Sequence, residues 1–118
     1  ADETEIGHEA MAKKCTNLAA HLGRRLADEP DDRLVGALGG RMLTLDDFCC
    51  TRLIEVLLHL DELSVSVGES RPETDPLGVA IVIDIVGSIA RHVHGDWKVV
   101  YALARSERVG DPPVFPVF

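Results

Sequence analysis

The chain has 118 residues, of which 46% are hydrophobic and 27% charged, the composition of one folded domain rather than of a disordered segment. Its 12 Lys and Arg against 20 Asp and Glu give a net charge of -8, which argues against binding to nucleic acids and to anionic membranes. The cysteines, Cys15, Cys49 and Cys50, form no CxxC motif, and residues 1–5 show no signal peptide. We therefore expect a cytoplasmic protein with reduced thiols.

The first predicted element is an amphipathic helix over residues 5–27. Its apolar side chains recur every three or four residues, at Met11, Cys15, Leu18, Leu22 and Leu26. The acidic segment 28–32 contains Pro30 and ends the helix. A short helical turn is predicted over residues 31–38, with Gly39 and Gly40 ending it.

The second long helix has the clearest start in the sequence. Thr44 is followed three residues later by Asp47 and then by an apolar run, which is typical of a helix cap. This pattern predicts a core helix that extends to about Leu63. The polar segment 68–75 then predicts a surface loop.

The third helix is predicted to begin at Asp75, a capping residue followed by Pro76 at the first helical position. Residues 77–90 are apolar except for Asp84 and Ser88, which is typical of the central helix of a bundle. The stretch is shorter than a bilayer crossing requires, so we expect no membrane association. The helix is expected to end at Gly95.

A last helix is predicted to follow, with Asp96 as its cap. The fold expected is all-α: a bundle of four to five helices as a single domain over residues 1–110, with an extended Pro-rich tail over residues 111–118. The β-branched residues of 79–86 leave an alternative open. In that α+β fold, segments 63–67, 79–86 and 98–104 would form a small sheet.

Asp84, His92 and His94 are the candidate residues of a buried polar site. A carboxylate within an apolar helix needs a partner or a function. The spacing of His92, His94 and Asp96 resembles the HxHxD segment of metal-dependent hydrolases, but Trp97 stands where another histidine is expected, and helical residues two apart point in different directions. We therefore expect no metal and no cofactor. Glu55 and His59 are expected to form a solvated contact four residues apart.

The absence of a catalytic motif favours a non-enzymatic protein–protein interaction module, a small regulatory or adaptor protein that self-associates. Its partner would be another protein or a second copy. The expected contact residues are the aromatic anchors Trp97, Tyr101, Phe115 and Phe118. The alternative is a small ligand-binding or enzymatic domain whose pocket is lined by Asp84, His92 and His94.

Overall fold

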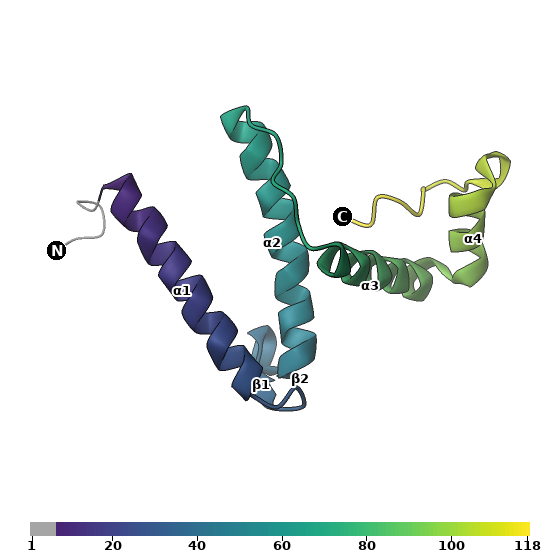
Figure 1. The fold of residues 1–118 in the computed structure, drawn as a ribbon. Coiled ribbons are helices and arrows are strands. Elements are labelled where there is room, and N and C mark those ends of the chain that lie inside the picture. The colour runs from purple at the N-terminus through teal and green to yellow at the C-terminus, as the bar shows by residue number, and fades with distance from the viewer. Residues whose placement is uncertain (1–6) are drawn as a thin grey trace. The chain divides into compact units, whose positions relative to one another are not determined.

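A computed structural model describes residues 7–118, in which four α-helices and one small hairpin follow one another (Figure 1). The elements are α1 (His8–Asp28), β1 (Leu34–Gly36), the 3-10 turn η2 (Leu38–Gly40), β2 (Met42–Thr44), α2 (Leu45–Val67), α3 (Pro76–His94), α4 (Asp96–Ala104) and the 3-10 turn η3 (Ser106–Arg108). The all-α prediction is confirmed. The chain divides into two compact units, Ala1–Phe48 and Cys49–Phe118, with the border inside α2.

The first unit contains α1 and the hairpin. Strands β1 and β2 pair antiparallel, with Val35 opposite Leu43. Gly39 and Gly40 have φ angles of 74° and 71°, a left-handed conformation that lets the chain reverse between the strands. The predicted helical turn over residues 31–38 is therefore wrong, because the glycine pair forms the loop of a hairpin instead of the end of a helix.

Helix α2 begins as predicted and ends later than predicted. The backbone N–H of Asp47 donates to Oγ1 of Thr44 at 3.1 Å, which confirms the cap. The hydroxyls of Ser64 and Ser66 each donate, at 2.8 Å, to the carbonyl oxygen four residues earlier. Segment 63–67 is therefore helical, and the helix ends at Gly68, whose φ is 71°.

Helix α3 confirms the predicted cap at Asp75 and the predicted end at Gly95. Oδ1 of Asp75 accepts the N–H of Leu77 at 2.9 Å, and Pro76 occupies the first turn. Residues 79–86 lie within this helix and residues 98–104 within α4, so the alternative α+β sheet is wrong. Capping and helical hydrogen bonding outweigh the β-branched composition here.

Helix α4 starts directly after Gly95, and the predicted cap at Asp96 is wrong. Gly95 holds the cap position, and no side chain caps the helix. The carboxylate of Asp96 instead accepts two hydrogen bonds from Arg91, Nε to Oδ1 at 2.9 Å and Nη2 to Oδ2 at 3.3 Å. This pair lowers the pKa of Asp96 and joins the end of α3 to the start of α4.

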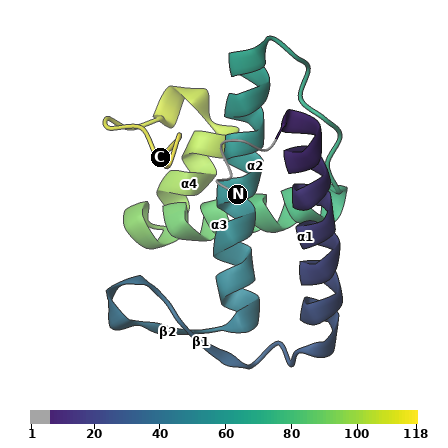
Figure 2. The same cartoon turned by 90° about the vertical axis from the view of Figure 1, so that its left-hand side faces the viewer.

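The C-terminal tail packs on its own unit. Val114 is buried in a cluster with Ala90 of α3 and Val99 of α4, and Phe115 lies partly buried against the cluster. Figure 2 shows the yellow tail beside α4. Residues 111–118 contain no helix or strand, and bends occur at Asp111, Pro112 and Val114.

Residues 77–90 were predicted to be buried, but in the structure most of their side chains are not. Ala90 is the buried residue of α3, whereas the side chain of Ile83 is 64% exposed. The physical reason is that α4 and the tail cover only the C-terminal end of the helix, at Ala90.

Within residues 7–118, α3 is also the one helix whose length and composition would allow a membrane crossing. The helix has 19 residues and a mean hydropathy of 1.5, so it extends beyond the apolar segment 77–90 on which the expected shortness was based. The core helices of soluble proteins have the same composition. Composition alone therefore does not tell whether α3 belongs in a protein core or in a membrane.

Candidate functional site

A shallow groove along α3 contains two of the three residues predicted for a polar site. Its volume is about 410 Å³, and it is lined by Asp84, Ile85, Ser88, Ile89 and His92. Asp84, Ser88 and His92 are four residues apart in turn, so they form one ridge along the helix, and Ile85 and Ile89 form the next. His94 is not part of this lining.

The groove does not hold a catalytic constellation. Asp84 and His92 are separated by eight residues, which is about 12 Å along a helix axis and beyond hydrogen-bonding reach. Both side chains are exposed, and neither has a hydrogen-bond or ion-pair partner among residues 7–118. The groove thus offers an acceptor at one end, an imidazole at the other and apolar surface beside them.

The predicted aromatic contact residues Trp97 and Tyr101 lie together on α4. Their ring centroids are 5.9 Å apart with an interplanar angle of 39°, and the guanidinium carbon of Arg108 lies 5.5 Å from the centroid of Tyr101. Trp97 is 70% exposed, while Tyr101 is half-buried. The exposed part of this pair is therefore the indole ring.

A small cavity lined in part by Tyr101 was not predicted from the sequence. It has a volume of about 210 Å³ and is lined by Lys98, Tyr101, Arg108, Gly110, Asp111, Pro112 and Val114. The tail and α4 enclose it together, so no local sequence pattern could have indicated it.

The two phenylalanines of the tail differ in environment. Phe115 is half-buried against the cluster of Ala90, Val99 and Val114, whereas Phe118 is 74% exposed. Of the four predicted contact residues, Trp97 and Phe118 are thus the two whose rings are largely open to solvent.

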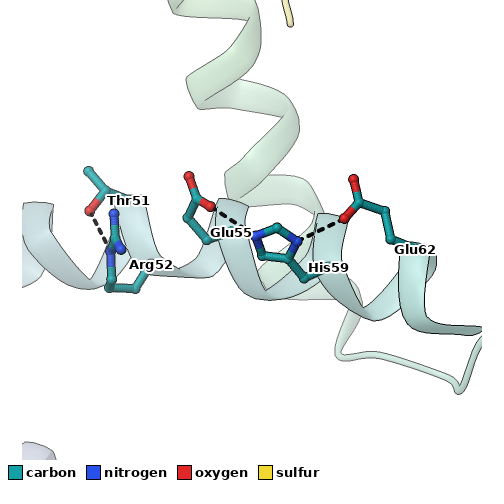
Figure 3. A network of polar contacts seen from close by, with 5 residues as sticks. All are labelled: Thr51, Arg52, Glu55, His59 and Glu62. Carbon is teal, nitrogen blue, oxygen red and sulfur yellow. Dashed lines mark hydrogen bonds and ion pairs between the residues drawn. The ribbon is translucent and has the colours of Figure 1, made fainter.

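His59 on α2 lies between two carboxylates, as Figure 3 shows. Its Nε2 is 3.3 Å from Oε2 of Glu55, the contact predicted from the spacing, and its Nδ1 is 2.9 Å from Oε2 of Glu62. The hydrogen bond and charge of Glu62, with a smaller effect of Glu55, raise the pKa of His59 above its ordinary value. Asp61, the other acid near His59, lies 3.7 Å from Nε of Arg71 instead.

The first unit contains a second apolar hollow that sequence reasoning missed. Its volume is about 270 Å³, and its lining combines α1 with the hairpin and the start of α2: Leu22, Arg25, Leu26, Glu29, Arg33, Val35 and Leu45. The leucines were predicted as one face of α1, but the hairpin opposite them was not.

Residues 7–118 hold no cluster of three or more His, Cys, Asp or Glu side chains placed to bind a metal ion. Cys15 is exposed and Cys49 is half-buried, and both are unpaired thiols. No protein-family model matches this sequence, and no curated protein or solved structure is significantly similar to it. The fold and sites therefore define a mainly helical protein with exposed apolar side chains.

Proposed function

We propose that this chain is a non-enzymatic protein–protein interaction module, a small cytoplasmic regulatory or adaptor protein that self-associates. The observation that carries the proposal is the small amount of apolar side chain that its own contacts bury. Among the described residues the buried hydrophobic side chains are Ile54, Ala90, Val99 and Val114. A folded chain of this length ordinarily buries most of its large apolar side chains.

Exposed apolar side chains occur on every α-helix. Leu18 on α1, Leu58 on α2, Ile83 on α3 and Leu103 on α4 are each open to solvent. Where such side chains form one contiguous surface, they mark a site that binds another protein or a membrane. With a net charge of -8 the chain is unsuited to anionic lipid, which favours a protein as the partner.

Trp97 and Phe118 are the proposed contact residues for the partner protein. Aromatic side chains contribute large contact areas and dominate the binding energy of many interfaces. Tyr101 supports the indole ring from the next turn of α4, and Phe115 holds the tail to the unit that presents Phe118. Tyr101 and Phe115 are thus proposed to contribute to partner binding by positioning Trp97 and Phe118.

Affinity capture from the native host tests this proposal. The full chain serves as bait in three forms: wild type, the double variant Trp97→Ser/Phe118→Ser, and Leu38→Ser. Leu38 is 94% exposed on the hairpin loop, so it provides an equally apolar change away from the proposed contact.

We expect a partner protein to be recovered with the wild type and with Leu38→Ser, and to be lost with the double variant. Recovery of the same proteins at the same yield with all three baits would contradict the proposed contact. Recovery of none with the wild type would contradict the adaptor function.

A further inference from the structure

We infer that α3 binds α3 of a second copy in antiparallel orientation, with the two-fold axis at Ser88, so that Asp84 of each copy faces the partner's His92. The inference rests on the self-association proposed above and adds its element, orientation and register. It assigns a role to the groove on α3, which no catalytic constellation explains.

The symmetry of the polar ridge carries the orientation. Asp84 lies four residues before Ser88 and His92 four residues after it, so each is about 6 Å along the axis from the centre of the ridge. Reversing one helix about Ser88 exchanges these two positions. A two-fold contact repeats every pair, so both Asp–His pairs form together. A parallel arrangement in the same register would place Asp84 against Asp84 and His92 against His92.

The chemistry of the exchanged pair is complementary. A carboxylate accepts a hydrogen bond from either ring nitrogen of an imidazole that carries a proton. At the centre, the small Ser88 side chains allow close approach. The ridge of Ile85 and Ile89 runs beside the polar ridge and provides the apolar area of the contact.

Nearby ionic groups do not compete for Asp84 and His92. Arg91 is adjacent to His92 in sequence, but its guanidinium is bound by Asp96 of the same chain. Among the described residues, Asp84 and His92 make no hydrogen bond or ion pair of their own. The antiparallel arrangement thus gives a partner to both Asp84 and His92.

The substitution Asp84→Asn separates the two orientations. The antiparallel arrangement predicts that the dissociation constant of the dimer rises by about tenfold, since two partly exposed pairs are lost. A parallel arrangement predicts tighter association, because two facing carboxylates are removed. Glu73→Gln removes a carboxylate from the exposed loop before α3 and is the matched control, for which no change is expected.

Reciprocal charge variants provide a second, independent measurement. Asp84→Lys removes both carboxylates that accept a hydrogen bond from His92, and His92→Glu places a carboxylate opposite each Asp84, so we expect each variant alone to associate more weakly. In their mixture one Lys–Glu ion pair and one Asp–His hydrogen bond form, and we expect a heterodimer. Sedimentation velocity with one variant fluorescently labelled measures this, and far-ultraviolet circular dichroism verifies that each variant remains helical.

Three results would overturn the inference. If the wild-type chain remains monomeric at all concentrations, both this inference and the proposed self-association fail. If the wild type self-associates but Asp84→Asn does not weaken it, or the mixture forms no heterodimer, only the α3 register fails. If the wild type is monomeric in buffer and associates only with neutral phosphatidylcholine vesicles, α3 is a lipid-binding element.

Discussion

Replacing Val114 by alanine tests whether the tail is part of the folded unit. Val114 is 6% exposed and contacts Ala90 and Val99, so the substitution removes two carbon atoms from a buried cluster. At about 0.8 kcal/mol per buried methylene, the lost transfer free energy is about 1.6 kcal/mol. The cavity left by the missing methyl groups costs further free energy, although the short tail can move to fill part of it. We therefore expect the free energy of unfolding to fall by about 2 kcal/mol in total.

Val109→Ala is the matched control. It removes the same atoms shortly before the tail, but Val109 is 47% exposed, so the expected loss is below about 0.5 kcal/mol. Urea unfolding, followed by circular dichroism at 222 nm and by Trp97 fluorescence, measures both variants at one protein concentration. Equal losses for the two variants would refute the burial of Val114, and with it the packing of the tail on α3 and α4.

Further predictions concern the caps, the histidine and the tail end. Thr44→Ala and Asp75→Ala each remove a helix cap, and each should lower the unfolding free energy by about 1 kcal/mol in urea titrations; no loss from either would contradict the cap. The pKa of His59 is raised above 6.5 by Glu62, so this contact stabilises the fold below pH 6.5 and is lost as the pH rises through the raised value. Glu62→Gln should lower that pKa in an NMR titration, and an unchanged value would contradict the hydrogen bond. Phe118→Ser should leave the melting temperature unchanged, because the ring is exposed; a lower one would show that the ring is packed.

The helix starts that could be predicted are those with local chemistry. Thr44 and Asp75 each bond a backbone N–H two or three residues ahead, so a short stretch of sequence contains the whole signal. Asp96 is an aspartate like Asp75, but its carboxylate pairs with Arg91, five residues before it. The prediction failed there because Gly95, one residue earlier, holds the cap position, and the Asp96 carboxylate pairs with Arg91.

The hairpin and the end of α2 could not be predicted from local patterns. A glycine pair serves equally as a helix end and as a hairpin loop, and only the pairing of Val35 with Leu43 decides between them. The alternation of residues 63–67 suggests a strand, but the hydroxyls of Ser64 and Ser66 bond carbonyls of the preceding turn within the helix.

The sequence led us to expect a buried polar site of Asp84, His92 and His94, whereas Asp84 and His92 are exposed on α3. Asp84 and His92 share the groove because their spacing fits one helix face, which the sequence contains. His94 is excluded by the same helical geometry. The predicted burial of α3 was wrong, since most of its apolar side chains are not buried. An apolar composition indicates that a helix packs against other apolar groups, but it does not indicate which segment or partner provides them.

Sedimentation equilibrium of the full, unlabelled chain over a wide concentration range tests most directly whether association covers the apolar helix faces. We predict a molar mass that rises with concentration from the 12.8 kDa of one chain toward twice that value. A mass of 12.8 kDa at every concentration would contradict it, because the apolar side chains of α3 would then have no second copy to cover them.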